Sequence, residues 1–528
     1  MASVTYDDRS FLVDGQRIWL VSGSIHYFRV PSALWADRLL KAKRGGLNCI
    51  DTYVAWNFHE AAEGRWEMSG DQDLGAFIRL AEELGLYVIL RPGPYIGGDW
   101  DFGGLPSWLT TKTGMAYRTS SAAYTHYLDK YLYQVLPRLA ELQVSRGGNI
   151  ILIQNENDYG MTAMPDRLSY LEFISQLFRR SGFDIPIITY NGLSDPPLAD
   201  SVECLGGSGE LVQNLKRLRR RQPGAPLLAI GFDTGGVDTW GRPHSVQPAR
   251  QTARRAMEVL GCGAQFNYYM YHGGTNLGFW GSRQSDCQAA YVTTSYDCDA
   301  PIAEGGGLSE TYFLTRLVNL LAQHMGRFLA GCTGGPPGVS VQDSTAVMGL
   351  TGPLACWAFV TNNGRDDIAT VRINLPTGRD LVVPLGLLGA AAVPYQLQVG
   401  PATVLDWANL TPLGMFGDRT LVFHGPAGWE ARFSINGQEF RAEVPAGNEP
   451  KVVEAQNLLV VLVRSELGTR TWLVDDTLVF GPSFVGQTLD DIVPGHGGRQ
   501  CAVLSIDGKL THQKLSSDHP ARPSEPRM

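Results

Sequence analysis

The sequence contains no apolar run long enough to cross a bilayer, since a membrane-spanning helix needs about 20 consecutive apolar residues. It also lacks a basic stripe: the formal net charge is −8 at pH 7, and one dense basic cluster, at 216–221, falls in a helix-like run before Pro223. We interpret this cluster as a solvated helix face. These absences predict that the partner is neither a membrane nor a nucleic acid.

Motifs for metals and cofactors are missing as well. The chain has 8 cysteines but no CxxC pair, and far fewer than a disulfide scaffold would carry. The histidines near predicted strand ends, His26, His59 and His272, lack the spacing of metal ligands. No glycine-rich phosphate turn follows the first predicted strand. We therefore expect no metal and no cofactor.

The N-terminal residues show neither the basic nor the apolar region of a signal peptide. Together with the scattered cysteines, this pattern predicts a reduced, cytoplasmic protein. The sequence leaves the oligomeric state open, and a homo-oligomer remains an alternative to a monomer.

What the sequence does contain is a regular alternation of short apolar runs with longer segments of helical periodicity, the pattern of βα units around a parallel sheet. Strands are predicted at 18–26, 47–54, 86–91, 150–154, 185–190, 202–205, 227–232 and 265–271, and helices at 74–84, 122–142, 168–180 and 249–260. This order predicts a (β/α)₈ barrel over residues 1–330. A doubly wound open sheet is the alternative, but it would need the missing phosphate turn.

The pattern of the sequence changes after residue 330. A glycine- and proline-rich stretch at 331–338 is typical of a linker, and short β-type runs punctuated by turn signals follow it. We predict one β domain over 331–415 and a second one, of sandwich or jelly-roll type, over 416–515. The polar, proline-rich tail at 516–528 is expected to be disordered.

Polar and acidic side chains gather where the predicted strands end, which is where a (β/α)₈ barrel places its active site. The second strand leads into Tyr53, the fourth into Asn157 and Asp158, the seventh into Asp233 and the eighth into Tyr269. One carboxylate at a strand end is commonly a structural ion-pair partner. Carboxylates after several strands, mixed with aromatic side chains, indicate instead a site for a carbohydrate.

Several motifs in order resemble the β-galactosidases of glycoside hydrolase family 35. They are GSIHYFR at 23–29, DTYVAWNFHE at 51–60, LRPGPYI at 90–96, GGLP at 103–106, GGTN at 273–276 and TSYD at 294–297. The resemblance covers residues from about 10 to 325. It implies a barrel enzyme that removes a terminal β-galactose with retention, using two glutamates at the ends of strands four and seven.

Both glutamates are replaced in this chain. The family pattern SEFYTGW at strand seven is aligned here with residues 230–236, which puts Gly231 at the position of the nucleophile, Asp233 at that of a tyrosine and Gly236 at that of a tryptophan. The pattern QVENEYG at strand four corresponds to QNENDYG at 154–160, so that Asp158 takes the place of the acid/base glutamate.

The pocket for the sugar also departs from the family pattern. A sugar-binding glutamate is replaced by Asp99 and a sugar-contacting tyrosine by Cys298. The substrate-binding positions that the resemblance implies are Tyr53, Gly98, Asp99, Trp100, Asn157, Gly236, Tyr269, Tyr296 and Cys298.

A rewired pair of carboxylates is one interpretation of these changes. Side chains two residues apart in a strand point the same way, so Asp233 projects from the same face as position 231, about 6–7 Å further along. Asp158 would then be the general acid and Asp233 the base for an attacking water, as in an inverting glycosidase. Glu156 is the next carboxylate to consider.

Two other interpretations stay open. The chain could be a nucleophile-lacking variant of a retaining β-galactosidase, natural or engineered, which resembles a glycosynthase. It could also be a non-catalytic carbohydrate-binding protein that keeps the barrel.

Overall fold

The computed structural model describes residues 2–515 apart from 162–165, 194–195, 208, 284–289, 336–337, 343–345, 496–499 and 506–507. The chain divides into two compact units, Met1–Pro336 with Met348–Pro353, and Pro337–Val347 with Leu354–Met528. The tail at 516–528, which we expect to be disordered, lies outside the described residues.

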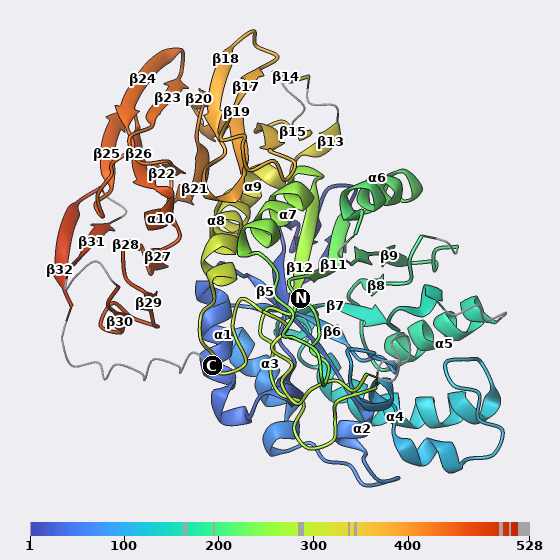
Figure 1. The fold of residues 1–528 in the computed structure, drawn as a ribbon. Helices are drawn as coiled ribbons and strands as arrows, with labels where there is room; N and C mark the ends of the chain where they lie inside the picture. Colours follow the sequence, from blue (N-terminus) through green and yellow to red (C-terminus); the bar gives the residue numbers. More distant parts are fainter. Residues whose placement is uncertain are drawn as a thin grey trace. The chain divides into compact units, whose positions relative to one another are not determined.

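A parallel barrel forms the first unit, as the sequence predicts, and helices lie around the outside of its strands (Figure 1). Its strands are β4 (Val21–Ser24), β5 (Cys49–Tyr53), β6 (Tyr87–Arg91), β7 (Ile150–Asn155), β8 (Ile187–Thr189), β9 (Ser201–Glu203), β10 (Leu205–Gly206), β11 (Leu227–Asp233) and β12 (Ala264–Tyr269). Most of their residues are buried, because a parallel sheet is covered on both faces.

One position in the ring of barrel strands is filled by two short strands instead of one continuous strand. The hydrogen-bonded order is β10-β11-β12-β4-β5-β6-β7-β8-β9, and only Cys204 separates β9 from β10. The two short strands therefore share the sixth position of an eight-stranded ring, β9 pairing with β8 and β10 with β11. The predicted strand at 202–205 spans this break.

The helices of the barrel unit are α1 (Trp35–Arg44), α2 (Trp56–His59), α3 (Leu74–Glu83), α4 (Ala122–Ala140), α5 (Arg167–Arg180), α6 (Leu211–Arg221), α7 (Ala249–Gly261), α8 (Glu310–His324) and α9 (Gly326–Leu329). Helix α3 shows why they form where they do. The Asp73 carboxylate caps its first turn by accepting a hydrogen bond from the Ala76 amide at 2.8 Å. Residues at helical spacing, Leu74, Phe77 and Ile78, are buried.

A small antiparallel sheet of β1 (Val4–Tyr6), β2 (Phe11–Val13) and β3 (Gln16–Ile18) precedes the barrel. Part of the glycine-rich stretch that we interpreted as a linker is instead a strand. Residues of β13 (Thr333–Gly335) pair antiparallel with Gly349–Thr351 of β15 (Ala346–Thr351). Glycine and proline content therefore did not exclude a short strand here.

The second unit is built of β-strands, as predicted. They are β14 (Ser340–Gln342), β16 (Cys356–Thr361), β17 (Thr370–Asn374), β18 (Asp380–Pro384), β19 (Ala390–Gly400), β20 (Thr403–Ala408), β21 (Thr411–Phe416), β22 (Thr420–Gly425), β23 (Glu430–Ile435), β24 (Gln438–Glu443), β25 (Lys451–Ala455), β26 (Leu458–Arg464), β27 (Thr471–Val474), β28 (Thr477–Phe480), β29 (Phe484–Val485), β30 (Ile492–Val493), β31 (Gln500–Ser505) and β32 (Leu510–Lys514), with the short helix α10 (Ser465–Gly468). Between the strands described here, pairing is antiparallel except between β22 and β26. A division into two β domains at residue 415 stays a prediction.

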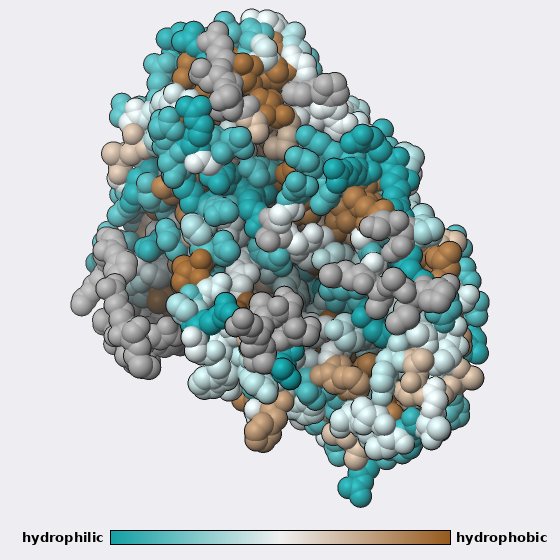
Figure 2. All heavy atoms as spheres, turned by 45° about the vertical axis from the view of Figure 1, so that its right-hand side comes forward, coloured by the Kyte–Doolittle hydropathy of each residue, from teal (hydrophilic) through white to brown (hydrophobic). Residues whose placement is uncertain are grey.

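Hydrophobic residues appear on the face drawn in Figure 2 as separate patches among hydrophilic ones. Scattered apolar exposure of this kind is ordinary for a globular domain. Among the described residues, no helix combines the length and hydropathy that a membrane span requires.

Candidate active site

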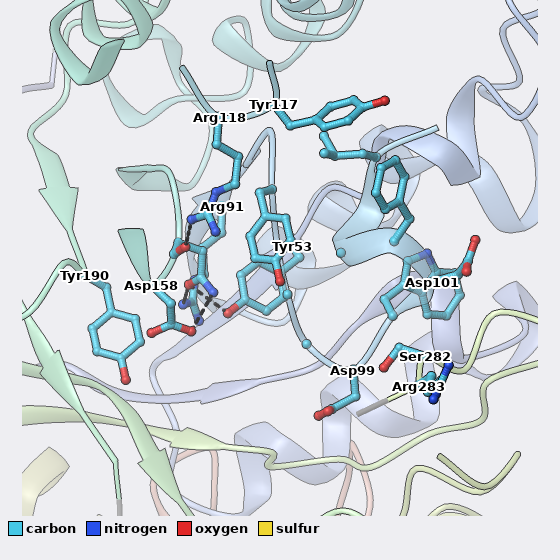
Figure 3. Close-up of a pocket in the computed structure, with 18 of the residues that line it drawn as sticks. Tyr53, Arg91, Asp99, Asp101, Tyr117, Arg118, Asp158, Tyr190, Ser282 and Arg283 are labelled. Atoms are coloured by element: carbon cyan, nitrogen blue, oxygen red, sulfur yellow. Dashed lines mark hydrogen bonds between the residues drawn. The ribbon is translucent and has the colours of Figure 1, made fainter. Parts of the chain in front are cut away.

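A cavity of about 1210 Å³ opens where the barrel strands end (Figure 3). Its wall includes the last residues of several strands, namely Tyr53 of β5, Arg91 of β6, Asp233 of β11 and Tyr269 of β12. Tyr190, the first residue after β8, also lines it. The carboxyl ends of the strands thus deliver polar side chains to one space, as barrels of this kind do.

Most of the predicted site residues meet in this cavity. Those on its wall are Tyr53, Gly98, Asp99, Trp100, Asn157, Asp158, Gly231, Asp233 and Tyr269. The structure does not place Glu156, Gly236, Tyr296 or Cys298 on that wall.

Asp158 is held on the cavity wall by its neighbours. Its backbone adopts a left-handed conformation, with φ of 47°. The Asn157 Nδ2 donates a hydrogen bond to its Oδ2 at 3.1 Å, and the Tyr190 side chain lies next to it on the same wall (Figure 3). Burial raises the pKa of Asp158 above its ordinary value, although the charges of Arg91 and Arg118 oppose this shift. A carboxyl that keeps its proton to higher pH is suited to act as an acid.

Asp233 is the second carboxylate near this end of the cavity. Burial raises its pKa to about 6, the nearby Arg255 lowers it, and the charge of Asp158 raises it further. The two carboxyls are therefore coupled electrically, so that a proton on one favours ionisation of the other. Two coupled carboxyls, one protonated and the other ionised, can supply both an acid and a base.

Gly231 lines the same cavity, without any steric need to be glycine. A Cβ built on it would sit 3.6 Å from the Tyr190 hydroxyl oxygen and 3.6 Å from the Gly206 Cα, which are ordinary contacts. Its φ lies outside the left-handed region. A side chain would thus be tolerated at its first carbon, and the backbone geometry does not require glycine at this position.

The Asn157 side chain is fixed by a buried ion pair. Arg91 pairs with Asp51 at 2.9 Å and also donates to the Asn157 Oδ1 at 2.8 Å, and the Tyr53 hydroxyl donates to the same oxygen at 3.1 Å. This fixes the orientation of the amide, whose Nδ2 then points at Asp158. Tyr53 and Asn157, which we predict to bind the sugar, therefore also contribute to positioning the Asp158 carboxylate.

Asp99 forms another part of the wall with two tyrosines. The Tyr296 hydroxyl donates to the Asp99 Oδ2 at 3.0 Å and lies 3.2 Å from the Tyr269 hydroxyl. Cys298 is buried behind this wall in an apolar cluster with Met270 and others, and burial raises the pKa of its thiol. Tyr296 and Cys298 thus support the wall from behind rather than line it.

Glu156 has partners that occupy its carboxylate. Arg118 forms an ion pair with it at 2.9 Å. The Tyr170 hydroxyl and the backbone N–H of Asn157 each donate a hydrogen bond to it at 2.8 Å. It is 1% exposed. Glu156 therefore orients Arg118, whose side chain stacks over the Tyr95 ring at 3.9 Å on the cavity wall.

Sequence reasoning missed several residues of the wall, above all Tyr190 and Arg118. Tyr190 ends a predicted strand, so the rule that found Tyr53 could have found it. Arg118 lies in the long connection between β6 and α4, where no strand end or spacing marks it. Among the described residues no group of His, Cys, Asp and Glu side chains could hold a metal ion.

The buried charge of Asp233 predicts a pH-dependent change in stability. Because the folded pKa of about 6 exceeds the ordinary 3.8, the folded state binds more protons between these values, and stability falls as pH rises through that window. Asp233→Asn carries no charge, so it is expected to raise the free energy of unfolding by up to about 3 kcal/mol at pH 8 and by much less at pH 4. Denaturant unfolding at the two pH values measures this. Equal effects at both would contradict the shift.

A (β/α)₈ barrel whose strand ends bring carboxylates, tyrosines and an asparagine into one cavity is an arrangement found in glycoside hydrolases. Within that class, residues 10–321 match the family described as glycosyl hydrolases family 35, and the chain belongs to this family. The resemblance that the sequence motifs indicated is confirmed.

Relatives in that family are named as β-galactosidases. The chain is 43% identical over 324 residues to the beta-galactosidase of Canis lupus familiaris, covering 60% of this chain and 48% of that protein. It is 42% identical over 324 residues to the one of Homo sapiens, covering 60% and 47%. The beta-galactosidase-1-like protein of Mus musculus is 40% identical over 315 residues, covering 58% and 48%. The chain thus spans about half the length of the curated relatives it matches.

Among solved structures, the beta-galactosidase from the psychrophilic Marinomonas ef1 gives a TM-score of 0.43 at 11% identity, covering 59% of this chain and 61% of that chain.

Proposed function

We propose that this chain is a glycoside hydrolase that acts on the terminal sugars of oligo- or polysaccharides, with Asp158 as general acid and Asp233 as general base. One observation carries the proposal. Both carboxylates line the cavity that Gly231 also lines, and burial raises the pKa of each of them above its ordinary value. Two carboxyls with raised pKa values on one cavity wall can serve as a proton donor and a proton acceptor.

The proposed reaction is an inverting hydrolysis. Asp233 takes a proton from a water, the water oxygen bonds to the anomeric carbon, and the bond from that carbon to the glycosidic oxygen breaks. Asp158 gives its proton to the departing oxygen. Inverting enzymes separate their two carboxyls by about 6.5–9.5 Å to admit this water, and the absence of a side chain at Gly231 leaves space for it.

Three other carboxylates are less suited to act as the base. Glu156 is engaged by Arg118 and by a tyrosine, away from the cavity. Asp99 accepts a hydrogen bond from Tyr296, which suits it to binding a sugar hydroxyl. Asp101 lines the cavity, but Figure 3 shows it on the side away from Asp158. These contacts favour Asp233.

The substituted pocket predicts weak hydrolysis of ordinary aryl β-galactosides. Relatives in the family are named for β-galactosidase activity. In this chain, however, Gly231, Asp99 and Cys298 depart from the family pattern. We expect a turnover number well below about 10 per second, the median for enzymes. Steady-state kinetics on an aryl β-galactoside, with natural oligosaccharides screened in parallel by mass, measures it. A turnover number at or above that median would contradict the expectation.

A further inference from the structure

The cavity is larger than one sugar ring requires. Its volume of about 1210 Å³ exceeds the roughly 300–1,000 Å³ of a typical small-molecule pocket. Beyond Asp99, its wall continues onto the segment between β6 and α4, at Phe102, Leu105, Ser107, Thr110 and Tyr117. Figure 3 shows Tyr117 on the side of the cavity opposite Tyr190 and Asp158.

An aromatic pair lines this distal part. The rings of Phe102 and Tyr117 lie 5.3 Å apart at an interplanar angle of 81°, an edge-to-face contact. Tyr117 packs in turn against Tyr124, at 6.2 Å. Phe102 remains 39% exposed, although an aromatic side chain of its size is usually buried more completely.

The backbone holds Phe102 in this exposed position. Its φ of 48° is a left-handed conformation that non-glycine residues adopt rarely, and that persists where neighbouring contacts impose it. Such contacts flank it on both sides. The Asn57 Nδ2 donates to the Asp101 carbonyl at 2.9 Å, and the amide of Gly103 donates to the Trp100 carbonyl at 2.9 Å. The ring is thus presented to the cavity by a fixed loop.

We propose that Phe102 and Tyr117 bind a second sugar ring, on the non-reducing side of the ring whose glycosidic bond is cleaved. The argument rests on the proposed function, which places the anomeric carbon beside Asp158. The polar groups of Tyr53 and Asp99 suit the ring that carries this carbon, and C4 of a pyranose lies opposite C1. A sugar linked at the far edge of that ring extends toward the aromatic pair.

Aromatic side chains suit such a ring, since the C–H face of a pyranose packs on a flat apolar surface. Hydroxyl groups of Ser107 and Thr110 lie on the same wall. The preferred glycone is therefore a disaccharide unit, or a sugar with a comparable substituent, rather than one unsubstituted hexose.

Hydrolysis of paired aryl glycosides tests this directly. The substrates are 4-nitrophenyl β-cellobioside and 4-nitrophenyl β-lactoside. The rate of the full chain on each is compared with its rate on 4-nitrophenyl β-glucoside. We expect kcat/KM to favour the disaccharide glycosides at least about tenfold, and Phe102→Ala or Tyr117→Ala to lower that ratio by about tenfold. Tyr133→Ala, which removes a 72% exposed tyrosine of α4 that is not among the cavity-lining residues, should leave the ratio unchanged.

Several outcomes would overturn the proposal. Equal use of both glycone lengths would do so, as would an equal loss on both in the Phe102→Ala variant. A loss confined to substrates extended at the reducing end would place the second ring on the aglycone side and contradict the assignment.

A binding measurement separates this proposal from the proposed function. If no glycoside is hydrolysed, cellobiose and lactose are titrated calorimetrically into the wild-type chain and into Phe102→Ala. Weakening of disaccharide binding by about tenfold in the variant would support the second ring site while hydrolysis fails. Unchanged or absent binding would overturn the site as well.

Discussion

Asp158→Asn is expected to abolish cleavage of substrates with poor leaving groups while largely sparing activated ones. The amide keeps the shape of the side chain but has no acidic proton, so a natural sugar leaving group must depart as an alkoxide. General acid catalysis contributes about 10²–10⁴-fold, and we expect a loss of that size on oligosaccharides. An aryl glycoside with an acidic phenol needs no such proton, so its kcat should fall far less.

The two substrate classes make this result specific to proton donation. Asp129→Asn changes a carboxylate on helix α4 that is 53% exposed and pairs with Arg180, and it should leave both rates unchanged. If Asp158→Asn turns over a natural oligosaccharide at the wild-type rate, Asp158 has no part in the mechanism.

Changes at 231 and 233 are expected to have the second large effect. If Asp233 is the base for water, Asp233→Ala should lower kcat by about 10²–10⁴-fold on activated and natural substrates alike. Gly231→Glu should also lower it, because its side chain would extend beyond the Cβ into the space proposed for the water. Steady-state kinetics on both variants, beside Asp129→Ala, measures this.

A nucleophile-lacking retaining enzyme predicts the opposite behaviour. Azide or formate would then occupy the space at Gly231 and restore attack on the anomeric carbon, and Gly231→Glu would rebuild a working hydrolase. Sugar binding with no hydrolysis by any variant would favour the non-catalytic interpretation. The three interpretations thus differ in the sign of the Gly231→Glu effect and in the response to azide.

The barrel could be predicted from the sequence because its strands are short, buried and separated by helices with clear apolar faces. The predicted helix at 74–84 and α3 (Leu74–Glu83) agree to one residue, since Asp73 marks its start as a capping residue. The break at Cys204 could not be predicted, because apolar periodicity does not show where one strand changes its hydrogen-bonding partner. Strand β13 was missed for a similar reason: its glycines carry no period-2 pattern.

The site could be predicted where a residue ends a strand, as for Tyr53, Asp233 and Tyr269, or follows one closely, as for Asp158 after β7. Contacts between segments far apart in the chain could not. The ion pair of Arg118 with Glu156 joins the loop after β6 to the turn after β7, and nothing local in either segment predicts it. The distal wall at Phe102 belongs to the same loop, whose path depends on tertiary contacts.

The anomeric configuration of the first product tests the central claim most directly. The wild-type chain is incubated with the natural oligosaccharide that it cleaves best, and proton NMR follows the anomeric signal before mutarotation. With Asp158 as acid and Asp233 as base for water, the released sugar has the configuration opposite to that of the substrate bond. Retention of configuration without any added nucleophile would contradict this assignment.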